Sequence, residues 1–475
     1  MKKHLLSPTL LSISFALLFL LASCIKEERP TGPNEYVNYW IHKEMKTYYF
    51  WNDQIPSSPD YSLNPEPFFE SILYKRGEVT GDRFSWIQEN YLELLQMLNG
   101  ITPYDIGFEY VGYLKAEGST EVLAQIAYVK PNTNAESIGL KRGDFFTKVN
   151  GTTLNTTNWK SLLSDEGVAT ITFVNTNTGV TTDKVVTKHA NYAEDPVFYH
   201  NIYEDNGHTI GYLVYNFFAS GTNSSYDKKL NGVFGLFNNA GITELVLDLR
   251  YNSGGSMNSA LLLGSMIVPN LNTNNVFTKT QFNSSLEAAL VKEYGQDFLI
   301  DKFQNKLSSG ETLNNVGNTI QKLYVLTGNW TASASELVIN GLLPYMPGNI
   351  FLIGNTTAGK NLGSFSIYEE NDPKNKWGMQ PIVLRYFNKD GTSDFLYGFA
   401  PDIEDKDNGE KLQLGDPDER MLKKAIDHIT GKYLPTKAGY SDSQWQTIGS
   451  SLEQKAWTNR AIRDGSLLRK VQTER

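Results

Sequence analysis

The stretch LVLDLRYNSGG, residues 245–255, decides the fold. A short apolar run ends in Asp-Leu-Arg and then in a glycine-rich turn, which is typical of a buried strand. Similar apolar runs follow at 322–328 and 349–355, and the segment SASELVINGLL at 333–343 between them has helical spacing. Because strands alternate with helices, the sequence predicts a largely parallel sheet covered by helices.

Outside this central region the pattern changes twice, as expected for a chain of 475 residues that is too long for one ordinary core. Apolar residues three and four apart predict amphipathic helices near the N-terminus, and short alternating runs then predict strands. Residues 271–319 are polar and irregular, which suggests a cap or insertion. The predicted divisions are an N-terminal helical domain at 36–100, a mostly β domain at 103–190, an α/β domain at 191–435 and a polar, partly helical tail at 436–475.

The N-terminus indicates export and lipid anchoring. A basic start and an apolar run from about Leu5 to Leu21 precede the tetrad Leu-Ala-Ser-Cys, which ends at Cys24. This tetrad resembles the lipobox of bacterial lipoproteins, which implies a signal peptide at 1–23, lipidation of Cys24 and a tether at 24–35. The charged residues 25–28 resemble the signal that sends some Bacteroidetes lipoproteins to the cell surface. We expect an outer-membrane lipoprotein of the cell envelope, facing either the periplasm or the surface; the alternative is a transmembrane anchor with an incidental cysteine.

Composition excludes several classes of function. The net charge of −9 and the lack of a basic cluster interleaved with aromatics argue against nucleic-acid binding. Cys24 is the only cysteine, so once it is lipidated no disulfide, cysteine nucleophile or thiolate metal site is available. No His, Glu or Asp cluster has ligand spacing, and we therefore expect neither a metal nor an organic cofactor.

Residues 134–151, NAESIGLKRGDFFTKVNG, resemble the signature of PDZ domains in bacterial proteases. Gly139 suits a helix C-terminus, and Asn150-Gly151 is a hairpin signal. The resemblance implies that Ile106, Gly107 and Phe108 form the loop that receives a peptide carboxylate, with a helix at 159–163 beside the groove. The alternative is a structural PDZ-like domain that binds no peptide.

Four ordered blocks extend the resemblance to most of the chain: 245–255, LTGNWTASASE at 326–336, NIFLIGNTTAGK at 349–360 and GFAPD at 398–402. They resemble the carboxyl-terminal processing (tail-specific) serine protease family. The resemblance implies an α/β fold with a ClpP/crotonase-like peptidase core, a preceding or inserted PDZ domain and the small helical domain. It also implies an endopeptidase that acts on polypeptide C-termini or unfolded chains.

The chemistry of these blocks predicts a serine–lysine pair. A serine hydroxyl needs a positioned base, and because the blocks contain no histidine we expect Lys360 to serve, with its pKa lowered from about 10.4 by burial. By resemblance the nucleophile is Ser333, at a helix start where the N–H of Ala334 can bind an oxyanion. Ser335 would lie about 200° further round the helix. The alternative for Ser333 and Glu336 is a capping box, Ser-x-x-Glu.

Two further residues complete the predicted site. The family assigns the second oxyanion donor to Gly255, paired with Ala334, and only glycine lets a backbone approach the substrate that closely. The family usually has a glutamine four residues after the lysine, whereas this chain has Ser364. The segment between Ser333 and Lys360 is also about two residues longer than usual, so the residue that orients the lysine is open.

Two other functions remain open at this stage. The chain could be a catalytically inactive scaffold on the cell envelope that displays its PDZ domain and binds peptides. It could also be a Ser–His–Ser–Glu relative of the tricorn type, although His200 and His208 lie in no matching motif.

Overall fold

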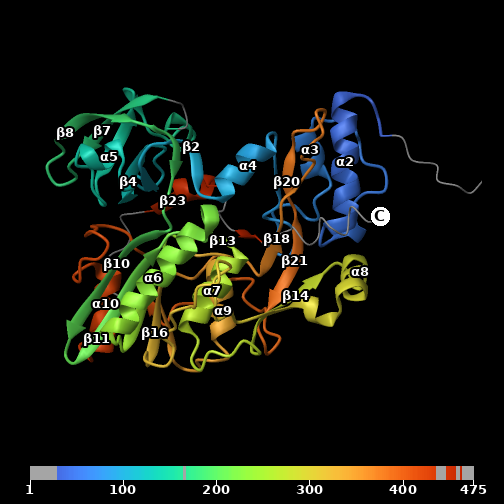
Figure 1. The fold of residues 1–475 in the computed structure, drawn as a ribbon. Coiled ribbons are helices and arrows are strands. Elements are labelled where there is room, and N and C mark those ends of the chain that lie inside the picture. Colours follow the sequence, from blue (N-terminus) through green and yellow to red (C-terminus); the bar gives the residue numbers. More distant parts are fainter. Residues whose placement is uncertain (1–28, 164–166, 435–445, 456–459, 463–475) are drawn as a thin grey trace, which may run out of the picture.

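The computed structural model describes residues 29–163, 167–434, 446–455 and 460–462. Figure 1 shows three parts: N-terminal helices at one end, a β-rich unit at the other, and an α/β unit between them. The predicted signal peptide, the lipidation site Cys24 and the first residues of the tether lie outside the described residues. Within the described ranges, no helix combines the length and the apolar character that a membrane crossing requires.

The N-terminal part is built on aromatic packing. Its elements are α2 (Pro33–Tyr48), η1 (Asn52–Gln54), α3 (Pro65–Ser71), β1 (Trp86–Gln88) and α4 (Tyr91–Leu98). Trp40 and Tyr48 are buried in the main hydrophobic core, because α2 turns its apolar face towards the α/β unit. The strand β1 was not predicted; it pairs antiparallel with β20 (Gly378–Gln380) and joins this region to the α/β unit.

The β-rich unit, residues 101–193, contains the short strands that the alternating pattern predicts. They are β2 (Ile101–Asp105), β3 (Phe108–Leu114), β4 (Val122–Val129), β5 (Phe145–Val149), β6 (Thr152–Thr153), β7 (Val168–Val174), β8 (Thr181–Thr187) and β9 (His189–Ala193). The short helix α5 (Asn134–Ser137) precedes the Gly-Asp turn as expected. The helix expected at 159–163 is reduced to the 3-10 turn η2 (Ser161–Leu163), with Trp159 buried just before it.

The central sheet of the α/β unit has the order β10-β11-β12-β16-β17-β22. Its strands are β10 (Val197–Asp205), β11 (His208–Tyr215), β12 (Glu244–Asp248), β16 (Lys322–Thr327), β17 (Ile350–Gly354) and β22 (Ile403–Glu404). Every pair is parallel except β10 with β11, which confirms the predicted parallel sheet.

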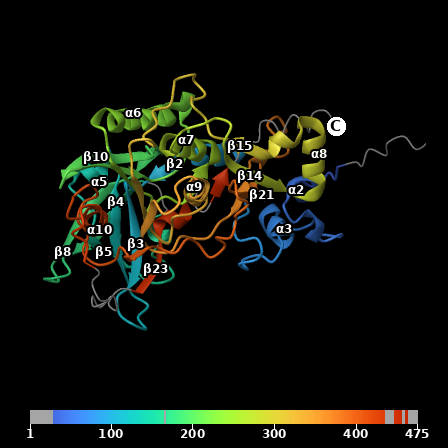
Figure 2. The same cartoon turned by 90° about the horizontal axis from the view of Figure 1, so that it is seen from below.

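Helices cover both faces of this sheet because successive strand residues point to opposite sides. Leu245 and Leu247 pack with the helices α6 (Ser225–Ala240), α7 (Met257–Ile267) and α9 (Ala334–Leu342). Val246 packs on the other face with α10 (Arg420–Ile429). Figure 2 shows α6 and α10 on opposite sides of the strands.

A second sheet corrects the prediction for residues 271–319. Its strand order is β13-β24-β18-β21-β14-β15, where β13 is Gly254–Ser256, β24 is Arg460–Ile462 and β18 is Leu362–Ser364. The supposed irregular insertion contains β14 (Val276–Phe282), α8 (Ser284–Tyr294), η4 (Gln296–Leu299) and β15 (Ile300–Lys302). β14 pairs antiparallel with β21 (Ile382–Phe387). Polar residues stand among the buried residues of its sequence, VFTKTQF, and for that reason the segment was predicted to be irregular.

The C-terminal tail is also more ordered than predicted. Its described segments form β23 (Gln446–Ser450), the 3-10 turn η6 (Ser451–Gln454) and β24 (Arg460–Ile462). The expectation of a partly helical tail holds for η6, whereas the two strands were not predicted, because they depend on pairing with two existing sheets. β23 extends the β-rich sheet beside β3, and β24 lies between β13 (Gly254–Ser256) and β18 (Leu362–Ser364).

Candidate active site

Ser333 lies immediately before α9, at the end of the loop that follows β16. Its backbone has φ 60° and ψ −108°, a region that non-glycine residues enter only under strain of about 1–3 kcal/mol. The side chain is fully buried, and its hydroxyl makes no hydrogen bond within the part of the chain that the structure describes. The Ser335 hydroxyl, in contrast, donates to the Asn252 carbonyl at 2.9 Å. Of the two serines, only Ser333 therefore has an uncommitted hydroxyl.

Glu336 connects the turn of Ser333 to the turn of Lys360. One carboxylate oxygen accepts from the N–H groups of Ser333 and Lys360, at 2.7 and 2.8 Å. The other accepts from the Thr357 hydroxyl at 2.6 Å and the Gly359 N–H at 2.7 Å. Burial raises the pKa of the Glu336 carboxyl, although these hydrogen bonds act in the opposite direction. The capping box weighed in the sequence is thus present: Glu336 accepts from the Ser333 N–H, and the Ser333 hydroxyl faces the Glu336 N–H without a hydrogen bond to it.

Lys360 is completely buried, and its Nζ lies 4.6 Å from the centre of the Phe84 ring. Its carbonyl oxygen lies 2.6 Å from the Tyr386 hydroxyl, and the Ser333 carbonyl oxygen lies 3.0 Å from the same hydroxyl. The single hydroxyl hydrogen of Tyr386 can therefore be donated to either of these two carbonyl oxygens. Together with Glu336 it holds the backbones of Ser333 and Lys360 side by side.

Gly255 lies in β13 with φ 129°, and a Cβ at this position would come within 2.1 Å of the Phe218 carbonyl oxygen. The residues on either side of it bond to Phe218: the Gly254 carbonyl accepts at 2.9 Å and the Ser256 N–H donates at 2.8 Å. Because alternate strand residues point their N–H groups to opposite edges, the Gly255 N–H faces away from Phe218. Ala334, the other predicted oxyanion donor, is the first residue of α9.

The remaining predicted residues are distributed over two places. Ser364 is buried in β18, four residues after Lys360, and pairs with Ile382. Ile106 and Gly107 lie between β2 and β3, and Phe108 is the first residue of β3, in the β-rich unit. The roles assigned to all of these residues stay predictions.

The carboxylate-binding loop already has an internal acceptor. The Gly107 N–H donates to the Asp105 side chain at 2.8 Å, and the Gly107 carbonyl accepts from the Lys130 N–H at 2.8 Å. Asp105 in turn contacts the Lys130 ammonium group. An incoming carboxylate would therefore have to displace Asp105.

Sequence reasoning missed a buried ionic network beneath the glycine-rich turn. Arg250 binds Glu419 through two hydrogen bonds of 2.7 and 2.9 Å, and it contacts Asp248 at 2.9 Å. Arg142 of the β-rich unit joins the same network through Asp407, at 2.9 Å. The Asp-Leu-Arg at the end of an otherwise apolar run was the available signal. Tyr386 and Phe84 belong to no motif, and nothing in the sequence marks them.

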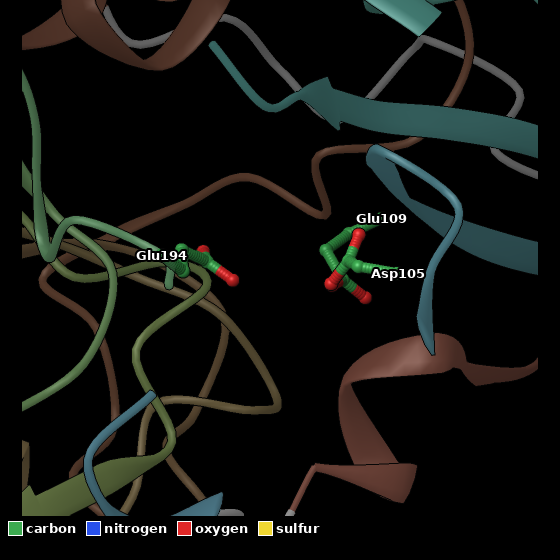
Figure 3. Close-up of side chains that lie close together, drawn as sticks. All are labelled: Asp105, Glu109 and Glu194. Atoms are coloured by element: carbon green, nitrogen blue, oxygen red, sulfur yellow. The ribbon is translucent and has the colours of Figure 1, made fainter. Parts of the chain in front are cut away.

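A second buried cluster lies where the β-rich unit meets the α/β unit. Figure 3 shows the carboxyl group of Glu194 directed towards Asp105 and Glu109, and carboxylate oxygens of the three lie within 4.8 Å of one another. Two ammonium groups supply positive charge: Lys130 contacts all three, and Lys455 contacts Glu109 at 2.7 Å and Glu194 at 2.5 Å. Burial raises the pKa of Glu109, but the two lysines outweigh it and bring the value to about 2.

Comparisons with known proteins place these features in a family. The model of peptidase family S41 matches residues 209–405, and the model of the peptidase S41 N-terminal domain matches residues 36–86. Together the two ranges cover more than half of the chain. No protein of curated function matches the sequence.

One solved structure agrees with this match. A protein described as an S41 protease from Bacteroides fragilis NCTC 9343 is 27% identical, with a TM-score of 0.66, over 86% of this chain and 100% of that one. More distant likenesses include a photosystem II D1 C-terminal processing protease, 17% identical over 79% and 94% of the two chains, TM-score 0.45. Mature CPAF complexed with lactacystin is 12% identical over 77% and 92%, TM-score 0.38.

Proposed function

The chain belongs to peptidase family S41 and is a serine-type peptidase, and on that premise we propose that it cleaves polypeptides with Ser333 as nucleophile and Lys360 as base. One observation carries the proposal. The buried, uncommitted hydroxyl of Ser333 and the buried Lys360 stand on two turns that share Glu336 and Tyr386.

Each group has a chemical task. Burial disfavours the charged ammonium, so Lys360 can be neutral and take the Ser333 proton as the hydroxyl attacks the peptide carbonyl. We assign the N–H groups of Gly255 and Ala334 to stabilisation of the oxyanion of the tetrahedral intermediate. The ammonium then returns its proton to the leaving amine, and water hydrolyses the acyl-enzyme by the reverse path.

Recognition of the substrate is proposed for the β-rich unit. We assign it a PDZ-like role: an extended polypeptide adds as a strand beside β3 and is delivered to Ser333. The natural substrates are then unfolded chains or exposed C-terminal segments. Residues 245–255 carry the link between the two units, because Arg250 and Arg142 share the acceptor Asp407.

Anchoring to the cell envelope through lipidated Cys24 is a separate proposal. It rests on the Leu-Ala-Ser-Cys tetrad alone. Growth with a radiolabelled fatty acid should label the wild-type protein, and Cys24→Ala should abolish the label. A labelled Cys24→Ala protein would refute the proposal.

Degradation of denatured casein tests the catalytic assignment. Ser333→Ala and Lys360→Ala should each abolish cleavage, whereas Ser335→Ala should keep it, because that change removes only a hydrogen bond to Asn252. Wild-type activity should rise with pH as Lys360 loses its proton. An active Ser333→Ala protein beside an inactive Ser335→Ala protein would contradict the assignment, and a wild type that cleaves no polypeptide would favour the inactive scaffold.

Lys411 provides the control for the pH profile. It is a second buried lysine, and burial lowers its pKa to about 8 despite the nearby Asp407 carboxylate. If the rise of activity with pH reports Lys360, Lys411→Met should leave its midpoint unchanged. If Lys411→Met abolishes the pH dependence, the titrating group is Lys411 and not Lys360.

A further inference from the structure

The C-terminal tail occupies the edge of the β-rich sheet where a PDZ ligand would bind. β3 begins directly after the loop of Gly107, and β23 pairs antiparallel with it, Gln446 opposite Leu114 and Ser450 opposite Val111. Residues later in the tail therefore lie nearer the loop. This is the polarity of a peptide that approaches the loop with its C-terminal side.

Side-chain contacts hold the tail in this groove. Ile448 packs against the core of the β-rich unit, which includes Trp159. The Ser450 hydroxyl donates to the Tyr110 carbonyl at 2.9 Å, and the Tyr110 N–H donates to the Ser451 hydroxyl at 2.9 Å. The seated segment is thus bound through both backbone and side chains, in the manner of a strand ligand.

The tail suits a groove that receives an internal segment. The Gly107 N–H is satisfied by Asp105, so this N–H is not available to a terminal carboxylate. Instead of ending at the loop, the tail continues past it and places Lys455 against Glu109 and Glu194. Lys130 also contacts the three carboxylates that Figure 3 shows, and because these acidic groups outnumber the lysines, the cluster favours a cation over a further carboxylate.

The same tail then enters the candidate active site. β24 pairs with β13 on one side, Ala461 opposite Gly255, and with β18 on the other, Ala461 opposite Gly363. The edge of β13 that β24 covers is the one opposite to Phe218, to which the Gly255 N–H is directed. Cα atoms of β24 lie within 8 Å of those of α9, whose first turn follows Ser333.

We propose that the described tail segments 446–455 and 460–462 act in cis as a pseudo-substrate, because they pair with β3 at the peptide-binding edge and with β13 beside the candidate active site. The inference rests on the proposed function of the two sites. A polypeptide substrate must displace the tail before it reaches Ser333. The enzyme is therefore held in a low-activity state that substrates with strong affinity for the β3 edge relieve.

The proposal predicts a relation between two measurements. A tethered ligand on a short linker has an effective concentration of about 1 mM. The factor by which truncation at Leu434 raises kcat/KM should then be about 1 mM divided by the inhibition constant of the free peptide 446–475 on that truncated chain. A peptide with an inhibition constant of about 100 µM would correspond to about tenfold activation.

Two variants test the tail without removing the cation of the buried cluster. A chain that ends at Asn459 lacks β24 and keeps Lys455. In the full chain, Ile448→Asp places a charge against the apolar core beside Trp159, whereas Thr447→Asp changes the neighbouring exposed residue. We expect the shortened chain and Ile448→Asp to raise kcat/KM for an added peptide substrate, and Thr447→Asp to leave it unchanged.

The opposite result would show that the tail is only a structural strand. Circular dichroism shows whether the shortened chain and the Ile448→Asp protein are folded. If both are folded and neither has a higher kcat/KM than the full chain, the proposal is wrong. A binding assay separates this failure from failure of the proposed function. In fluorescence anisotropy the peptide 446–475 should bind a Ser333→Ala chain that ends at Leu434, whether or not any variant is active, and absence of binding overturns the inference.

Discussion

Glu336→Gln is the substitution that most directly tests how the site is built. The change keeps the size of the side chain and replaces one carboxylate oxygen by an NH₂ group. Each carboxylate oxygen accepts two hydrogen bonds: one from Ser333 and Lys360, the other from Thr357 and Gly359. In either orientation of the amide, its NH₂ group therefore faces one of these two pairs of donors and cannot accept their hydrogen bonds.

The loss can be estimated from these contacts. Hydrogen bonds to a charged group contribute about 1.5–3 kcal/mol each, so losing two costs about 3–6 kcal/mol. Removal of a buried charge offsets part of this cost, since burial already raises the pKa of Glu336. At about 3 kcal/mol the melting midpoint of a chain of this length should fall by about 3 °C, since the unfolding entropy is about 2.1 cal/mol/K per residue. Displacement of either turn by 1 Å should lower kcat by about a hundredfold.

Calorimetry and casein cleavage measure the two effects, with Glu287→Gln as the control. Glu287 accepts one backbone hydrogen bond, from Phe282 at 3.0 Å, which an amide oxygen can also accept. Wild-type stability should also contain a component that is complete below the ordinary glutamate pKa and is lost as pH rises through the raised folded value; Glu336→Gln should lack it. If Glu336→Gln melts and cleaves like Glu287→Gln, the two turns do not depend on this carboxylate.

Two other predictions follow from the same region. Gly255→Ala should abolish cleavage, because the new Cβ would lie 2.1 Å from the Phe218 carbonyl oxygen; casein degradation measures this, and full activity would exclude a tightly constrained turn. Arg250→Met should destabilise the protein by about 3–5 kcal/mol in urea unfolding, since it leaves Asp248 buried without its cationic partner and Glu419 with the contact to Arg142 only. In the wild type, Arg250 outweighs burial and lowers the pKa of Glu419 to about 2, so this contribution is present above the ordinary glutamate pKa and is lost as pH falls towards 2.

The central fold was predictable because local patterns and global architecture agree there. The apolar runs at 245–249, 322–327 and 350–354 each form a strand of the parallel sheet. Prediction failed where pairing depends on distant partners. β1 and β14 are short or partly polar, and they become strands because β20 and β21 offer free edges. A single sequence does not contain that information.

The candidate site divides in the same way. Ser333, Lys360 and Gly255 stand in contiguous blocks and could be selected by motif and chemistry. Tyr386 could not, because its function depends on two carbonyl groups that belong to other elements. Glu336 was visible, but as a helix cap. Its connection to the turn of Lys360 arises only when the loop 355–360 folds back over α9.

The strain at Ser333 and the cap at Glu336 have a common explanation. A non-glycine residue with positive φ before a helix has a strained backbone, so contacts from other residues must hold it in that conformation. The Glu336 carboxylate supplies that restraint through the Ser333 N–H, so the hydroxyl need not act as the cap and stays uncommitted. The Ser-x-x-Glu pattern therefore does not compete with catalysis. Under the proposed mechanism, Glu336 would hold the backbone of Ser333 while the Ser333 hydroxyl acts as nucleophile.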